Sequence, residues 1–258
     1  MATLQTKPNR EVETPRPAPT RGGSLAPGGL RGAGWKWATG LIMAYVCYGA
    51  FYIATGNVNF GASDNSARIV FFHVPCAILS YVAYVVGFVY GLRHLMKKQT
   101  SGHLIDDRKS AAAMELGFLF CTLATVSGSI FAGMVWGSFW NWDPRETSIV
   151  IMLLLYASYL VLRSALANNP NQRAQLSAVY AILALVPATF LIWVVPRVMQ
   201  SNHPTQTLQN PANTSWQYKA VLYPSFLAFT FLFVWLFQLR CRLQALRDNR
   251  HQRLEAQR

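Results

Sequence analysis

The chain has 258 residues, of which 52% are hydrophobic and only 13% are charged, whereas an ordinary soluble domain carries about 25% charged residues. This composition excludes an ordinary soluble domain and indicates a protein whose solvent is the lipid bilayer. The formal net charge is +13, but the basic residues cluster in tails and in alternate loops between apolar segments. We therefore expect contact with membrane lipid and no binding of nucleic acid.

The first segment, 1–34, is polar and holds five prolines and six glycines without a long apolar run. Such a composition cannot form a core, so we expect a disordered cytoplasmic tail. A cleavable signal peptide is not expected, because no short apolar region with a small-residue cleavage site precedes the first span. An organelle transit peptide is the alternative, and Glu11 and Glu13 argue against it.

Six apolar segments follow, each close to the ~20 residues that a helix needs to cross a bilayer. Backbone N–H and C=O groups cannot stay unpaired in lipid, so these segments are predicted to be helices. The expected fold is an all-α integral membrane protein with one transmembrane domain over 35–240 and a basic cytoplasmic tail over 241–258. The predicted spans are 35–55, 69–92, 112–135, 147–163, 177–196 and 219–239.

The distribution of Lys and Arg predicts the orientation of these spans. Nineteen of the 23 basic residues lie before residue 37, in the 93–111 and 163–176 loops, or from residue 240 onward. Cytoplasmic loops carry the excess of positive charge, so both termini are predicted to be cytoplasmic. The 56–68, 136–147 and 197–218 loops then face outward.

The orientation divides the five histidines into two groups. His94, His103 and His251 fall in cytoplasmic segments and are expected to be solvated surface residues. His73, at the outer end of the second span, and His203, in the third outer loop, fall on the outer side. Imidazole is a good ligand for iron, and two imidazoles could fill both axial positions of a porphyrin. Each histidine alone could instead be a neighbour of lipid headgroups.

The second outer loop reads WGSFWNWDPRET over 136–147 and combines aromatic residues with charges. Its tryptophans could cover a flat porphyrin, although tryptophans near an interface also form aromatic belts. A belt does not explain the compact charges that follow. Anionic propionates would favour an arginine on this side. The candidate residues are Trp136, Trp140, Trp142, Asp143, Arg68, Arg145 and Arg197.

A structural alternative exists for the charged end of this motif. The stretch from Asp143 to Thr147 immediately precedes the fourth span. An Asp or Thr at such a position can cap the helix, and an acid there is favoured by the helix dipole. We expect Asp143 or Thr147 to act as a cap, which would also hold the loop in shape.

The motif resembles the tryptophan-rich WWD signature of the haem-handling membrane proteins of cytochrome c biogenesis. In the CcmC branch the signature reads about WGxxWxWDxRxTS. FFHVP around His73 is similar to the family's first outer histidine segment, and His203 occupies the place of the second. The resemblance covers roughly residues 35–240. The matching positions are Trp136, Gly137, Trp140, Trp142, Asp143, Arg145, Thr147 and Ser148.

The resemblance implies a protein of the cytoplasmic membrane that binds haem b at the outer face and delivers it to a periplasmic haem chaperone (CcmE-like), without being an enzyme. It implies that His73 and His203 are the axial iron ligands, and that Trp136, Trp140, Trp142 and Asp143 form the platform for haem and chaperone. The implied further partners are ABC-type complex subunits (CcmA/CcmB-like) and a small CcmD-like protein.

Pro144 and Glu146 depart from the CcmC pattern. The form WDPxE is more typical of the CcmF and CcsA branches, which attach haem to apocytochrome. The alternative function is therefore a component of a cytochrome c synthetase. Those proteins are generally longer and carry further histidines within the membrane, which favours the CcmC branch here. A plain permease is less favoured, because the spans hold almost no polar or ionisable residues near the midplane.

Overall fold

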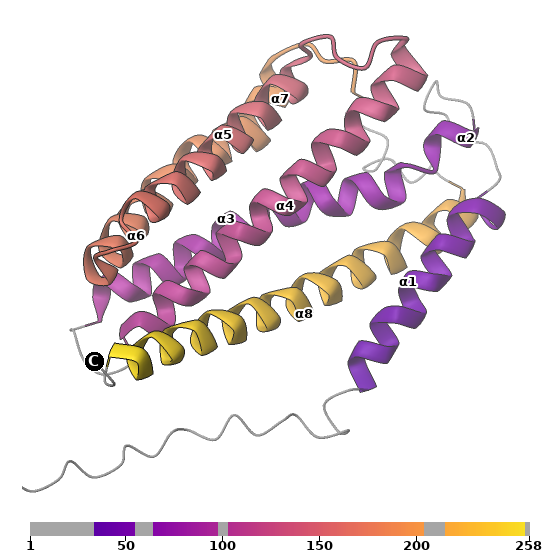
Figure 1. Cartoon of the computed structure of the whole chain (residues 1–258). Coiled ribbons are helices and arrows are strands. Elements are labelled where there is room, and N and C mark those ends of the chain that lie inside the picture. Colours follow the sequence, from indigo (N-terminus) through magenta and orange to yellow (C-terminus); the bar gives the residue numbers. More distant parts are fainter. Residues whose placement is uncertain (1–33, 55–63, 98–102, 204–214, 256–258) are drawn as a thin grey trace, which may run out of the picture. The chain divides into compact units, whose positions relative to one another are not determined.

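The computed structural model describes residues 34–54, 64–97, 103–203 and 215–255 (Figure 1). The predicted disordered tail lies, apart from Gly34, outside these residues, and the fold described below is that of Trp35–Arg258. The described residues are helical and include no strand, which confirms the all-α class. The elements are α1 Gly34–Tyr52, α2 Asp64–Ala67, α3 Val70–Met96, α4 His103–Trp136, α5 Pro144–Ala165, α6 Pro170–Thr189, the π-helix η2 Phe190–Val194, α7 Val195–Val198 and α8 Trp216–Glu255.

Five helical segments among the described residues are long and apolar enough to cross a bilayer, and they coincide with the second to sixth predicted spans. They are Ser66–Met96, Leu104–Trp136, Pro144–Ala165, Pro170–Val198 and Trp216–Arg250. The first predicted span, 35–55, forms α1, a helix of 19 residues that is not among the five. Helix α1 is shorter than the five, and Lys36 lies in its first turn. The chain is a multi-pass membrane protein.

Several helices run beyond the predicted spans. Helix α4 begins at His103 rather than at 112, and α8 continues to Glu255, so that most of the predicted basic tail is helical. A helix rises 1.5 Å per residue. The 40 residues of α8 are therefore about 60 Å long, twice the ~30 Å thickness of the bilayer core. The C-terminal part of α8 extends well past the apolar segment.

Buried acids join the helices near the start of α4. Asp107 accepts two hydrogen bonds from the guanidinium of Arg163 in α5, at 2.6 and 3.0 Å. Asp106 accepts one from Lys97, just after α3, at 2.5 Å. Asp106 and Asp107 are only 1% and 3% exposed. Because a buried carboxylate is costly unless it is paired, these contacts hold α3, α4 and α5 together at this end.

His94 and Glu115 also lie toward this end of the helices. His94 was expected to be a solvated surface residue, but it is buried, with 2% of its surface exposed. The prediction was wrong because α3 continues to Met96, which carries His94 onto a packed face of the helix. Glu115 of α4 pairs with Arg240 of α8 and is partly exposed.

Small residues allow the helices to approach closely. A Cβ on Gly117 of α4 would lie 2.1 Å from the Tyr156 hydroxyl oxygen, so only glycine leaves room for this α5 side chain. That hydroxyl donates to the Ser80 carbonyl of α3 at 2.5 Å. A Cβ on Gly91 of α3 would lie 3.3 Å from the Ala178 carbonyl of α6. Close packing at small residues is the usual way in which helices associate in a membrane.

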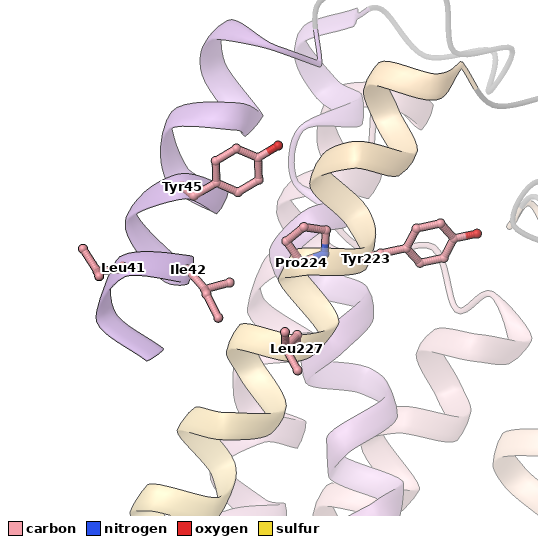
Figure 2. A pocket seen from close by; sticks show the side chains of 6 residues that line it. All are labelled: Leu41, Ile42, Tyr45, Tyr223, Pro224 and Leu227. Carbon is pink, nitrogen blue, oxygen red and sulfur yellow. The ribbon is translucent and has the colours of Figure 1, made fainter. Parts of the chain in front are cut away.

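An apolar groove separates α1 from α8 (Figure 2). Six residues line it, Leu41, Ile42 and Tyr45 from α1 and Tyr223, Pro224 and Leu227 from α8. The two helices touch nearby, where a Cβ on Gly49 would lie 2.7 Å from a Val221 methyl group. None of the residues that line the groove is among the sequence-predicted site residues.

The fifth predicted span is not one regular helix. After α6 the chain widens into η2, where the N–H of Val195 bonds to the Phe190 carbonyl, five residues earlier. Pro196 follows in α7 and has no N–H to continue the helical ladder. Proline and π-helical turns are common causes of irregular helix ends. The segment ends at Val198 and leads directly into residues 199–203, which reach the loop between α4 and α5, residues 137–143.

Candidate functional site

The WWD loop is the short connection between α4 and α5. Helix α4 ends at Trp136, and Gly137 follows with a φ of 75°, in the left-handed region that suits glycine. Trp142 also has a positive φ, of 58°, which costs a residue with a side chain about 1–3 kcal/mol. The Thr147 hydroxyl donates to the Trp142 carbonyl at 3.3 Å. The loop is thus held in one strained conformation by its own neighbours.

A capping box begins α5 and confirms Asp143 as the cap. The Arg145 N–H donates to Asp143 Oδ1 at 2.9 Å, and the Asp143 N–H donates to Glu146 Oε2 at 3.2 Å. The Asn141 N–H also donates to Glu146 Oε2, at 2.9 Å. Pro144 occupies the first helical position, where its missing N–H is not needed. Pro144 and Glu146, the residues that depart from the CcmC pattern, therefore have a local structural reason.

The Asp143 carboxylate also binds the segment that follows α7. Oδ1 accepts from the Ser201 hydroxyl at 2.9 Å, and Oδ2 accepts from the Asn202 N–H at 2.7 Å. Burial raises the pKa of Asp143. The hydrogen bonds from Arg145, Asn202 and Ser201 and the nearby His203 lower this pKa by a larger amount, so the pKa lies below its ordinary value. An ionised carboxylate therefore joins the WWD loop to residues 201–203, as charge-assisted hydrogen bonds are strong.

His203 lies beside the WWD loop as a result. Its ring centre is 5.1 Å from that of Trp136, in an edge-on arrangement at 66°. Its Nδ1 is 3.7 Å from Asp143 Oδ1, and this buried nitrogen has no hydrogen-bond partner among the described residues. Burial, the Arg145 charge and the nearby His73 lower the pKa of His203 to about 4, with Asp143 opposing them. His203 is therefore a neutral imidazole at pH 7.

His73 lies in the first turns of α3, and its ring contacts α4. Its Nδ1 is 3.1 Å from the Ser127 hydroxyl oxygen. A Cβ on Gly128 would lie 2.8 Å from Cε1 of the ring. Helix α3 begins at Val70, and Pro75 falls in its second turn. Because His73 influences the pKa of His203, the two imidazoles lie within electrostatic range of each other.

The three candidate arginines are not equally close to the histidines. Arg145 acts on the pKa of His203 and has a buried Nε without a hydrogen-bond partner among the described residues. Arg197 donates to the Trp193 carbonyl at 2.5 Å and lies over the Trp193 ring, with 5.1 Å between its Cζ and the ring centre. Arg68 lies 5.7 Å above the Phe51 ring of α1. The structure therefore brings Arg145 to the histidines most directly.

The aromatic residues of the loop have different surroundings. Trp136 packs edge-on against Phe131 on one side and His203 on the other. Trp140 and Trp142 are perpendicular to each other, at 88° with ring centres 5.8 Å apart, so they do not form one flat floor. Trp142 is 70% exposed, which leaves a large apolar surface at the tip of the loop.

Sequence reasoning missed the polar residues that position the histidines. Ser127 is one small residue in an apolar span, and Ser201 and Asn202 lie in an unremarkable polar loop. The roles of these residues are not visible without the fold, because Ser127 is more than 50 residues from His73, and Ser201 and Asn202 are more than 50 residues from Asp143.

The arrangement fits a haem. Two imidazoles lie within electrostatic range, Arg145 has a buried Nε without a partner among the described residues, and exposed aromatic surface belongs to the same loop. An axially ligated haem needs only two protein ligands, since the porphyrin supplies four nitrogens. Asp143 Oδ1 lies 3.7 Å from the His203 Nδ1, near this imidazole but beyond hydrogen-bond distance.

Comparison with known proteins places the chain in a family. Residues 30–256 match the family model for Heme exporter protein C (CcmC). The chain is 30% identical over 210 residues to Heme exporter protein C of Rhodobacter capsulatus, covering 80% of this chain and 82% of that protein. It is 33% identical over 190 residues to Heme exporter protein C of Bradyrhizobium diazoefficiens, covering 70% and 68%.

A shorter similarity links the chain to a sibling branch. It is 40% identical over 88 residues to Cytochrome c biogenesis protein CcsA of Oenothera argillicola, which covers 34% of this chain and 25% of that protein. The CcmC similarity runs through nearly the whole chain, whereas the CcsA similarity is local. The chain therefore belongs to the heme exporter protein C family.

Proposed function

We propose that this protein binds haem b at the outer face of the cytoplasmic membrane and delivers it to a periplasmic haem chaperone of the CcmE type for cytochrome c maturation. The observation that carries the proposal is the Asp143 clamp, which binds Ser201 and Asn202 and brings His203 beside Trp136. Relatives named heme exporters support haem as the cargo. The proposed role is binding and delivery, without a chemical transformation.

In this proposal the iron is held between His73 and His203. Bound haem iron offers two axial positions that neutral imidazole nitrogens fill. The pKa of His203, lowered to about 4, keeps it neutral, so protons do not compete with iron near pH 7. His73 contributes from the rigid helix α3. The chain holds the haem non-covalently, since its cysteines form no CxxCH motif.

Other residues of the site would contact the periphery of the haem. Arg145 is the first candidate for a propionate, because its buried Nε has no partner among the described residues and its charge acts on His203. Arg197 and Arg68 are further candidates on the same side. Trp140 and Trp142 offer aromatic surface, and the exposed Trp142 is also available to a docking chaperone.

The proposed partners occupy two sides of the membrane. The haem chaperone would approach the WWD loop from the periplasm. ABC-type complex subunits of the CcmA/CcmB kind, with a small CcmD-like protein, would help to release the loaded chaperone. The chain itself contains no GxxxxGK[ST] loop, so an ATPase in the complex would be a separate chain. The names of the relatives support a haem-export setting.

A second candidate function rests on a specific observation. The local similarity to CcsA and the form WDPRET favour a role in attaching haem to apocytochrome. The two functions differ in the acceptor of the haem. Incubating the haem-loaded protein with a purified haem chaperone and, separately, with apocytochrome containing a CxxCH site would distinguish them. Transfer to apocytochrome alone would favour the alternative.

The ligand assignment is tested by the absorption spectrum of the purified protein. The wild type should show the Soret and α/β bands of a six-coordinate bis-histidine haem. The His73→Ala, His203→Ala double variant should lose these bands, whereas His251→Ala, at the far end of α8, should keep them. A normal bis-histidine spectrum in the double variant would remove both residues from the site.

A further inference from the structure

We propose that Ser127 and Gly128 make His73 the fixed axial ligand of this site, which leaves His203 as the ligand that is displaced when haem is passed on. The inference rests on the proposed function and concerns how the two ligands differ. It is carried by the hydrogen bonds around each ring and by the element on which each histidine lies. Ser127 and Gly128 are positioning residues, because they act on the iron only through His73.

The first step concerns the proton on His73. The Ser127 hydroxyl has one proton, and it donates this proton to the Leu123 carbonyl, 2.7 Å away, with the Ala124 carbonyl at 3.2 Å. Its oxygen can therefore only accept from the His73 Nδ1, 3.1 Å away. A neutral imidazole that donates from Nδ1 keeps its lone pair on Nε2. Ser127, together with the Ala124 carbonyl, which also bonds the His73 ring, thus selects the tautomer in which Nε2 is ready to bind iron before haem arrives.

The second step concerns the position of the ring. The His73 N–H bonds to the Ile69 carbonyl at 2.8 Å, so its backbone belongs to the helical ladder of α3. The ring lies directly over Gly128 of α4, where an added Cβ would approach Cε1 to 2.8 Å. Real Cβ atoms are not found this close to a ring carbon. Helix α3 therefore fixes the backbone of His73, and α4 packs against its ring.

His203 is held quite differently. It lies after the end of α7 rather than within a helix, and its own N–H bonds to the Ser201 hydroxyl at 3.1 Å. Its Nδ1 remains 3.7 Å from Asp143 Oδ1, beyond hydrogen-bond distance. The segment is attached mainly through Asp143, which binds Ser201 and Asn202. Loops of this kind open more readily than packed helices, so a partner that disturbs Asp143 would release His203 first.

The Ser127 part is tested by comparing Ser127→Ala with Ser127→Thr. Loss of a hydrogen-bond partner of a metal-bound histidine costs about 10- to 100-fold in affinity, so Ser127→Ala should weaken haem binding by roughly tenfold or more. It should also raise the ferric/ferrous midpoint potential, because His73 becomes a weaker electron donor. Ser127→Thr keeps the hydroxyl and should restore both values. An Ala variant with wild-type affinity and potential would overturn this part.

The asymmetry is tested with free imidazole and two cavity variants. His203→Gly should retain haem on His73 as a five-coordinate species and regain the six-coordinate spectrum when imidazole is added. His73→Gly should retain less haem and recover less of the spectrum at the same imidazole concentration. Equal retention and equal recovery, or the reverse order, would overturn the proposal. Far-ultraviolet circular dichroism on each purified variant checks that it is folded.

These outcomes separate the inference from the proposed function. If the wild type itself shows no bis-histidine haem spectrum, the proposed function fails and the inference fails with it. The wild type could show that spectrum while Ser127→Ala binds haem like the wild type and His203→Gly and His73→Gly retain equal amounts of haem. In that case only the inference fails. The midpoint potential is the informative reading here, since a residue with a purely structural role would change the yield of protein but not the potential.

Discussion

Asp143→Asn is the most informative single substitution, because one carboxylate holds two segments of the site together. Asp143 accepts hydrogen bonds from the Arg145 N–H, the Ser201 hydroxyl and the Asn202 N–H at 2.9, 2.9 and 2.7 Å. Asparagine has nearly the same shape but only one accepting oxygen, and its NH2 group would face a donor. At least one of the three donors therefore loses its acceptor.

The magnitude follows from the charge on the acceptor. A hydrogen bond to a charged group contributes about 1.5–3 kcal/mol, so the attachment of residues 201–203 should weaken by about 2–3 kcal/mol. This corresponds to a roughly 30- to 150-fold increase in the population of the detached segment. Since His203 is carried by this segment, haem affinity should fall, by up to this factor once the detached segment is the major population.

Two measurements check this prediction. Amide hydrogen exchange at Asn202 and His203 should accelerate in Asp143→Asn, and spectrophotometric titration should give the weaker haem affinity. Asp248→Asn is the matched control, because Asp248 pairs with Arg108 near the other end of α4 at 2.6 Å. The reasoning is refuted if Asp143→Asn exchanges and binds haem like the wild type, or if Asp248→Asn is impaired to the same degree.

Three further predictions concern the same loop. The pKa of His203 is lowered from 6.5 to about 4 in the attached segment. Between these two pH values, His203 therefore binds a proton when the segment is detached but not when it is attached. Attachment should therefore be strongest above pH 6.5 and weaken as the pH falls toward 4, and hydrogen exchange at pH 7 and pH 5 should show this, with no such slope in His203→Gln. Glu146→Gln should keep the helix start but weaken the capping box, lowering the thermal unfolding midpoint slightly, with Thr147→Ser as a near-neutral comparison. Arg145→Gln should raise the pKa of His203, which pH-dependent chemical shifts of its ring would reveal; an unchanged pKa would mean that Arg145 does not act on it.

Much of the fold could be predicted from the sequence because a bilayer imposes simple demands. Residues 112–135 and 219–239 had to form helices, since lipid offers no hydrogen-bond partners to the backbone. The ends of these helices could not be predicted, because polar residues outside the bilayer can continue a helix when a neighbour packs against it. Contacts such as Arg240 with Glu115 and Arg108 with Asp248 accompany the extension of α8.

The motif of the site was also visible in the sequence, and one of its local contacts was predictable. The cap of α5 depends on residues within three positions, so spacing limits it to Asp143 or Thr147, and the structure identifies Asp143. The same spacing accounts for Glu146. Pro144 and Glu146 depart from the family pattern, yet both have a role at the start of α5.

What the sequence alone determined is therefore the membrane class, the helical segments, the aromatic loop and its cap, because each depends on composition or on neighbours along the chain. Only the tertiary structure decided which residues meet in the site. Ser127 reaches His73 from another helix, and Asp143 reaches Ser201 and Asn202 across the end of α7. Hydrogen bonds between such distant residues form only after the helices have packed, and no periodicity in the chain encodes them.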